Sequence, residues 1–165
     1  FHTGTLGFSW GVPAIEPGAG VQERFGMVAT VMGDALRSLG LDARVGEVAG
    51  EYCPGSFSVN LAGAIKVMGV GQRLVRGAAH VGGVVVVTDS PLLRRVLVPV
   101  YEALGLEWDP ATAGAVEDRL PGIAVETVRR AILDQVGARA EIVSQPLPLE
   151  VVEMGRRLAA GHRAG

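Results

Sequence analysis

The sequence has few of the residues on which several common kinds of site depend. Its 165 residues include one cysteine, Cys53, which excludes an internal disulfide framework and a multi-cysteine metal site. The three histidines, His2, His80 and His162, lie far apart and lack the spacing of metal ligands on a helix, so we predict no metal site. Fifteen basic and 17 acidic residues give a formal net charge of −2, which disfavours nucleic acid as a partner.

Long apolar runs and aromatic residues are also scarce. No uninterrupted apolar stretch approaches the ~20 residues that cross a bilayer, and the chain does not begin with a basic region followed by an apolar one. We therefore expect no membrane association and a cytoplasmic location. Aromatic residues make up 5% of the chain and hydrophobic residues 48%, so the core of the domain must consist mainly of aliphatic side chains.

The spacing of the apolar residues predicts one α+β domain with a mixed central sheet and flanking helices. Alternation or β-branched runs indicate strands at residues 6–10, 43–48, 57–60, 65–70, 81–87 and 139–144. Helical periodicity indicates helices at residues 21–39, 90–104, 125–136 and 148–160, with a further short helix between 109 and 121. Ser90 is expected to cap the second helix, with Pro91 in its first turn.

Lys66 is the one lysine among the 15 basic residues, and it lies in the second strand of a predicted hairpin that turns near Ala62 and Gly63. A lysine on a hairpin is most often a solvated charge. The standard nucleotide motifs are missing: the segment 69–74 lacks the third glycine of a dinucleotide fingerprint, and there is no Gly-Lys-Ser/Thr phosphate loop.

Residues 46–87 resemble the catalytic core of the biotin/lipoate ligase superfamily, and most closely its lipoate–protein ligase branch. That branch presents a lysine in the pattern G-x-x-K-[ILV]-x-G-x-[AG]-Q-[RK], which is matched here by Gly63, Lys66, Val67, Gly69, Gly71, Gln72 and Arg73. The family's next segment, rich in small residues, corresponds to residues 79–83, with His80 and Gly82. The opening FHTGTLGFSW is similar to the end of the family's earlier glycine-rich motif, so the resemblance covers about residues 1–105.

The resemblance implies a fold, an activity and partners. Residues 1–137 would form a lipoate ligase-like catalytic domain without its N-terminal part, and residues 138–165 would add a strand and a helix packed on the same domain. The implied activity attaches a lipoyl or octanoyl group to the lysine of a lipoyl carrier domain, in a 2-oxoacid dehydrogenase complex or in glycine cleavage H protein. The lipoate or octanoate would react through an acyl-adenylate made from ATP with Mg²⁺.

By the same resemblance, Lys66 contacts the carbonyl and phosphate oxygens of the acyl-adenylate. A compact point charge suits this role because negative charge develops there in the transition state. The residues expected to bind the substrate around it are Gly63, Val67, Gly69, Gly71, Gln72, His80 and Gly82. Glycines at these positions would leave room for a thin acyl chain.

Two other interpretations stay open. Cys53, thirteen residues before Lys66, is either a buried small hydrophobe or a nucleophile that holds the acyl group as a thioester, as in the amidotransferase-type octanoyltransferases, which need no ATP. The residues around Cys53 differ from that branch. The chain could also be a non-catalytic relative that binds an acyl ligand or a protein, because the family's arginine and main glycine run have no counterpart here. From its beginning at Phe1 we expect a processed or truncated piece of a longer protein.

Overall fold

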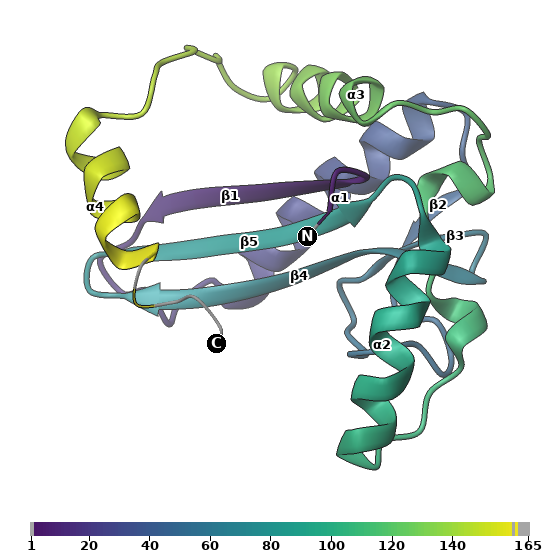
Figure 1. Ribbon diagram of the computed structural model, residues 1–165. Coiled ribbons are helices and arrows are strands. Elements are labelled where there is room, and N and C mark those ends of the chain that lie inside the picture. Colours follow the sequence, from purple (N-terminus) through teal and green to yellow (C-terminus); the bar gives the residue numbers. More distant parts are fainter. Residues whose placement is uncertain (1, 160, 162–165) are drawn as a thin grey trace.

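A five-stranded sheet forms the centre of the computed structural model, which describes residues 2–159 and residue 161 (Figure 1). The strands are β1 Thr5–Pro13, β2 Ala43–Val45, β3 Val59–Leu61, β4 Ile65–Val75 and β5 Ala78–Val86, and their order in the sheet is β1-β5-β4-β3-β2. The predicted α+β class is confirmed. All four strand pairs are antiparallel, and the mixed character predicted for the sheet is limited to one isolated parallel bridge between Lys66 and Ala113.

Tight turns account for the antiparallel pairing of the central strands. At the β3–β4 turn, Ala62 and Gly63 have φ of 58° and 69°, and the Ala64 N–H donates to the Leu61 carbonyl at 3.1 Å. Positive φ at both central residues is the geometry that matches the twist of a hairpin. Gly77, with φ of 79°, turns the chain from β4 into β5. The hairpin predicted from the sequence is therefore confirmed, and a second one follows it.

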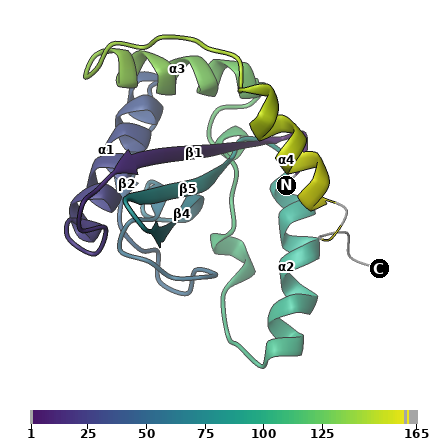
Figure 2. The same cartoon turned by 90° about the vertical axis from the view of Figure 1, so that its left-hand side faces the viewer.

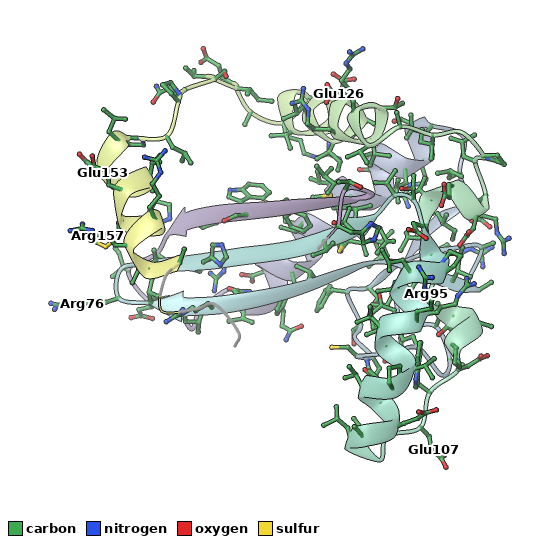
Figure 3. All side chains as sticks on the ribbon, in the orientation of Figure 1. Arg76, Arg95, Glu107, Glu126, Glu153 and Arg157 are labelled. Carbon is green, nitrogen blue, oxygen red and sulfur yellow. The ribbon has the colours of Figure 1, made fainter. Side chains whose placement is uncertain are left out.

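Four helices flank the sheet, at α1 Val21–Ser38, α2 Ser90–Leu104, α3 Val125–Gly137 and α4 Leu149–Ala159. Helices α1 and α3 lie against each other and cover one side of the sheet, whereas α2 projects away from the end of β5 (Figures 1 and 2). The core lies between α1 and the sheet and is mainly aliphatic, as expected. Labelled charged residues, such as Arg76 at the β4–β5 turn and Glu126 on α3, point outward from this core (Figure 3). Among the described helices, none is both long and apolar enough to cross a bilayer.

Three local predictions are corrected by the structure. The N-cap of α2 is Asp89, whose carboxylate accepts the Leu92 N–H at 3.2 Å, while Ser90 is buried and donates to Asp118. Two 3₁₀ turns, Pro110–Thr112 and Val116–Asp118, stand where one short helix was predicted.

The strand predicted at residues 139–144 is wrong. This segment has no strand partner and leads to Pro146 and Pro148, which cannot donate to a sheet. Helix α4 forms as predicted, but it has no buried residue, and Leu149 and Leu158 are exposed. The packing of residues 138–159 therefore adds little to the core. Phe1, Ala160 and His162, which the sequence analysis used, lie outside the described residues.

Candidate functional site

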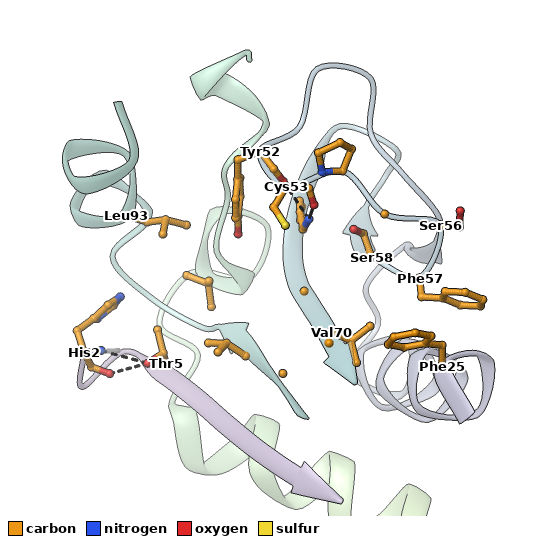
Figure 4. Close-up of a pocket in the computed structure, with 18 residues that line it drawn as sticks. His2, Thr5, Phe25, Tyr52, Cys53, Ser56, Phe57, Ser58, Val70 and Leu93 are labelled. Carbon is orange, nitrogen blue, oxygen red and sulfur yellow. Dashed lines mark hydrogen bonds between the residues drawn. The ribbon is translucent and has the colours of Figure 1, made fainter. Parts of the chain in front are cut away.

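A hollow of about 550 Å³ lies between β4, β5, the loop from Tyr52 to Ser58 and the start of α2 (Figure 4). Two glycines of β4, Gly69 and Gly71, form part of its lining, together with Val84 and Val86 of β5. Side chains alternate between the faces of a strand, so these residues point away from the buried Met68–Val85 pair of the same strands. The hollow thus covers the face of the sheet that does not carry the core, and it also reaches Val70 and Phe25, which pack against the core.

The missing side chains at Gly69 and Gly71 keep the floor of the hollow open. A Cβ atom added to Gly71 would have no atom within 4 Å, and one added to Gly69 would meet Lys66 Cε at 3.6 Å. Gly83, on the core-facing side of β5, differs from them because an added Cβ would overlap the Phe8 ring. Two of the glycines predicted to bind substrate therefore leave space for a thin apolar ligand.

Lys66 lines the hollow and is only 2% exposed, so it is not the solvated lysine of the simplest interpretation. Its Nζ donates to Glu51 Oε1 at 3.0 Å, to the Tyr52 carbonyl at 3.0 Å and to the Cys53 carbonyl at 2.6 Å. An ammonium has three protons, and all three are used within the protein. A contact between Lys66 and an acyl oxygen, as the resemblance predicts, would replace one of these bonds.

The strand pairing fixes the backbone of Lys66. On one side Lys66 pairs with Asn60 of β3, next to an irregularity of register between Val59 and Asn60. On the other side the Lys66 carbonyl accepts the Gly114 N–H at 3.1 Å. Because the backbone is held from both sides, the long side chain of Lys66 can reach the loop that precedes β3.

Cys53 is exposed and lines the hollow beside Lys66, so it is not a buried small hydrophobe (Figure 4). Its φ of 43° lies in the left-handed region, which is costly for a residue with a side chain. The backbone is held there at both ends of the residue. Its N–H donates to the Tyr101 hydroxyl of α2 at 2.6 Å, and its carbonyl accepts from Lys66.

Aromatic side chains support the loop of Cys53. The Tyr52 ring centroid lies 4.8 Å from Lys66 Nζ, within range of a cation–π contact. Trp108 packs against Tyr52 and Tyr101, with ring centroids 5.8 and 5.1 Å away. Burial of the phenol, followed by the nearby Glu51 carboxylate, raises the pKa of Tyr52 to about 12, so this ring stays neutral at physiological pH.

A second hollow of about 640 Å³ adjoins the first, because Gly71, Gly83 and Val84 line both. It contains four more of the residues that match the family pattern, Gln72, Arg73, His80 and Gly82. His80 and Arg73 are cross-strand neighbours, and His80 Nε2 lies 2.5 Å from the Ser9 hydroxyl of β1. The structure therefore brings His80 and Arg73 to the same face as Gly69 and Gly71.

Three predicted substrate-binding residues are engaged elsewhere. Gln72 borders the second hollow, but its amide accepts from Arg24 Nε at 2.6 Å and donates to the Val21 carbonyl at 3.2 Å, which ties β4 to α1. Gly63 forms the β3–β4 turn, and Val67 is fully buried in the core. Neither Gly63 nor Val67 lines the two described hollows, because the first serves the turn and the second points into the core.

The sequence analysis missed Glu51, Tyr52, Tyr101 and His2, which belong to the site or border it. Glu51 and Tyr52 stand directly before Cys53, but nothing in their local pattern distinguishes a buried carboxylate from an exposed one. Tyr101 comes from α2, 48 residues after Cys53, so only the fold brings them together. Within residues 2–159 and 161, no group of three His, Cys, Asp or Glu residues could hold a metal ion.

Comparison with curated proteins finds two relatives with the same description, octanoyl-[GcvH]:protein N-octanoyltransferase. The chain is 29% identical to the protein from Geobacillus kaustophilus over 121 residues, which is 73% of this chain and 42% of that protein. It is 41% identical to the protein from Exiguobacterium sibiricum over 64 residues, which is 39% of this chain and 23% of that protein. The chain thus spans less than half the length of the curated relatives it matches. No family model matches it.

Comparison with solved structures finds a T. acidophilum protein described as a lipoate protein ligase with bound lipoic acid, with a TM-score of 0.71, 21% identity, and coverage of 96% of this chain and 61% of that one. The fold is that of a lipoate–protein ligase. A bi-partite lipoate protein ligase of Thermoplasma acidophilum, solved in a study with its E2 lipoyl domain, gives a TM-score of 0.69 at 20% identity, covering 94% of this chain and 59% of that one. The structure of lipoate-protein ligase A bound with ATP gives a TM-score of 0.63 at 21% identity, covering 86% of this chain and 57% of that one. These relatives and neighbours are consistent with the lipoate–protein ligase branch.

Proposed function

We propose that this chain carries the acyl-binding and reactive part of an enzyme that transfers an octanoyl or lipoyl group to the lysine of a lipoyl carrier domain. One observation carries the proposal: an apolar hollow with a glycine floor is lined also by an exposed thiol and a buried ammonium, Cys53 and Lys66. Burying a methylene group stabilises a complex by about 0.8 kcal/mol, so such a hollow can hold an eight-carbon chain. The descriptions of the relatives and neighbours support the same chemistry.

The position of Cys53 favours a thioester route. The Cys53 thiol would lose its proton and attack the acyl carbonyl of an octanoylated carrier, forming a carbon–sulfur bond. The amide C–N bond would break, and that proton would pass to the carrier's lysine nitrogen, which leaves as an amine. The amine of the acceptor lysine would then attack the thioester, forming the new amide and releasing the thiol. Lys66 lies beside the carbonyl of Cys53 and supplies positive charge where the oxyanion develops. The two curated relatives are named for this type of transfer, from octanoyl-[GcvH] to protein.

Transfer through an acyl-adenylate is the second route, and it follows from the family resemblance and from the neighbour that was solved with ATP. Arg73 and His80 in the second hollow could face an anion. The residues that line the two described hollows include no aspartate or glutamate, and both oxygens of Glu51 already accept hydrogen bonds. These residues alone do not fit a magnesium site, so ATP and Mg²⁺ stay predictions.

The partners proposed for the enzyme are carrier domains that bear an acylated or acceptor lysine. The curated relatives name GcvH as the octanoyl donor, and one structural neighbour was studied with an E2 lipoyl domain. A cytoplasmic location is part of the same proposal.

Acyl loading of Cys53 tests the proposal and separates the routes. The protein is incubated with octanoylated H protein and analysed by intact mass, with Cys53→Ser as the matched variant. We expect an octanoyl adduct on the wild-type protein and none on the variant. Transfer to a carrier domain that needs ATP and proceeds equally well in Cys53→Ser would instead establish the adenylate route. A protein that binds octanoate but transfers nothing by either route, with the full chain present, would show the non-catalytic interpretation to be correct.

A further inference from the structure

Glu51 is a buried carboxylate that joins the two ends of the loop on which Cys53 lies, and it is 4% exposed. Its Oε1 accepts hydrogen bonds from Lys66 Nζ at 3.0 Å, from the Ser58 hydroxyl at 2.7 Å and from the Gly55 N–H at 3.1 Å. Its Oε2 accepts the Val48 N–H at 3.0 Å. Every one of these donors is supplied by the protein.

We propose that Glu51 is a positioning residue, which acts through Lys66 to hold the Cys53 loop in its reactive arrangement. This inference rests on the proposed function. Glu51 does not line either described hollow, so it does not touch the acyl chain there. Its connection to the carbonyl of Cys53 runs through Lys66 Nζ, which binds both groups. Glu51 also holds the same loop directly, through the Gly55 N–H and the Ser58 hydroxyl.

Burying the charge of Glu51 costs free energy unless a cation and hydrogen-bond donors compensate for the lost water. Removing a carboxylate from water costs several kcal/mol, which a close cation and additional donors offset only when the geometry is good. Both conditions hold here, because the Lys66 side chain is 3% exposed and that of Glu51 is 0% exposed. In this dry setting the ion pair is a strong, charge-assisted hydrogen bond. It therefore keeps the Lys66 ammonium at one place while its other two protons bind the carbonyls of Tyr52 and Cys53, and a substrate oxygen would replace one of these carbonyls.

The strained backbone at Cys53 explains why such a hold matters. The φ of 43° at Cys53 is unfavourable and persists only while neighbouring contacts enforce it. One of these contacts is the bond from Lys66 to the Cys53 carbonyl. If the Glu51 charge is removed, Lys66 loses its counter-ion and its fixed position, and the Cys53 loop loses that contact.

The variant Glu51→Gln tests the inference, because its side chain has nearly the same shape without the charge. A carboxamide has only one acceptor atom, so it must turn its NH₂ group toward the Val48 N–H or toward the donors on the opposite side. We expect kcat for acyl transfer from octanoylated carrier to fall about tenfold to a hundredfold, as for small displacements of reacting groups. KM for the acyl donor should stay within about twofold, because the hollow is unchanged.

Glu47→Gln is the matched control, since it makes the same chemical change at an exposed glutamate four residues earlier. It should transfer acyl groups like the wild-type protein. A purely structural role for Glu51 would lower the thermal midpoint of Glu51→Gln but leave kcat of the folded protein unchanged. That result would overturn the inference.

A double-mutant cycle with Lys66→Met shows whether Glu51 acts through Lys66. We expect the double variant Glu51→Gln/Lys66→Met to lose less activity than the product of the two single losses, because the part of the Glu51 effect that passes through Lys66 is already removed. It should also be more stable than Lys66→Met, in which Glu51 is a buried charge without a counter-ion. Losses of activity that multiply in the double variant would contradict the inference.

Alkylation of Cys53 by iodoacetamide keeps the test independent of acyl transfer. Cys53 is the one cysteine, so the intact mass reports on it directly. We expect the alkylation rate and its pH profile to differ from those of the wild-type protein in Glu51→Gln, and to match them in Glu47→Gln. Identical profiles in all three proteins would overturn the inference. A wild-type protein that alkylates normally but transfers nothing would instead contradict the proposed function.

Discussion

Replacing Gly71 by valine should block the hollow without harming the fold. An added Cβ at Gly71 meets no atom within 4 Å, and a β-branched residue suits a strand. The valine side chain would point into the space shared by the two hollows. It fills the space of about three methylene groups, so an octanoyl chain would lose about 2.4 kcal/mol of burial at ~0.8 kcal/mol each. That corresponds to a roughly fiftyfold lower kcat/KM for octanoyl transfer.

The assay measures kcat/KM for carriers that bear acyl chains of different lengths. Gly69 lies beside the Lys66 side chain, and Gly71 lies two residues farther along β4, roughly 6–7 Å away. A chain whose carbonyl sits at Lys66 reaches Gly71 only when it is long. Gly71→Val should therefore reduce octanoyl transfer strongly and butanoyl transfer little.

Gly11→Val is the control for this experiment. Gly11 stands in β1 on the same face of the sheet, an added Cβ there also meets no atom within 4 Å, and it lines neither described hollow. This variant should behave like the wild-type protein with every chain length. Octanoyl transfer that is equally fast in Gly71→Val and Gly11→Val would refute the assignment of the hollow to the acyl chain.

Three further changes test the packing, the loop and a buried phenol. Gly83→Ala should lower the free energy of unfolding by about 1–3 kcal/mol, because the added Cβ would overlap the Gly69 carbonyl oxygen and the Phe8 ring; an unchanged urea midpoint would contradict this. Tyr101→Phe should lower the free energy of unfolding by about 1 kcal/mol, since the Cys53 N–H loses its acceptor. Equal stability of the variant and the wild-type protein would show that this hydrogen bond is absent in solution. The pKa of Tyr52 is raised to about 12, so the neutral phenol contributes fully to the free energy of unfolding below pH 10. This contribution is lost as the pH rises through 12. The wild-type protein should lose roughly 2–3 kcal/mol more over that interval than Tyr52→Phe, and parallel urea curves would contradict the shift.

Segments whose apolar pattern is long and regular could be predicted from the sequence. The periodicity of α1 and α3 and the β-branched run of β5 lead to elements that the structure contains, with boundaries shifted by a few residues. Such patterns succeed because each of these elements buries one face in the core. The segment 139–144 failed for the converse reason: it has some alternation but no free strand beside it, and Val143 is 66% exposed.

The part of the site that lies on one strand was also predictable. Gly69 and Gly71 are two residues apart on β4, so the alternation of a strand places them on one face, along the hollow. Lys66, three residues before Gly69, would point to the other face of a regular strand, and the register irregularity opposite Val59 and Asn60 brings it to the same hollow.

The site residues that come from other elements could not be predicted. Tyr101, for example, reaches Cys53 only because of the direction in which α2 leaves β5. Gln72 shows the limit of matching a pattern, since its amide serves the contact with α1.

The geometry around Lys66 gives a physical reason for the single lysine of an arginine-rich chain. Its three acceptors are a carboxylate oxygen and two successive backbone carbonyls, and one Nζ atom reaches all of them. A tetrahedral ammonium can direct three bonds from a single point, whereas the five N–H groups of a guanidinium lie in a plane and are spread over three nitrogens. A guanidinium in this closed space would leave several N–H groups without acceptors, at a cost for each. The resemblance selects Lys66 by pattern, and the buried network requires the same residue type for an independent reason.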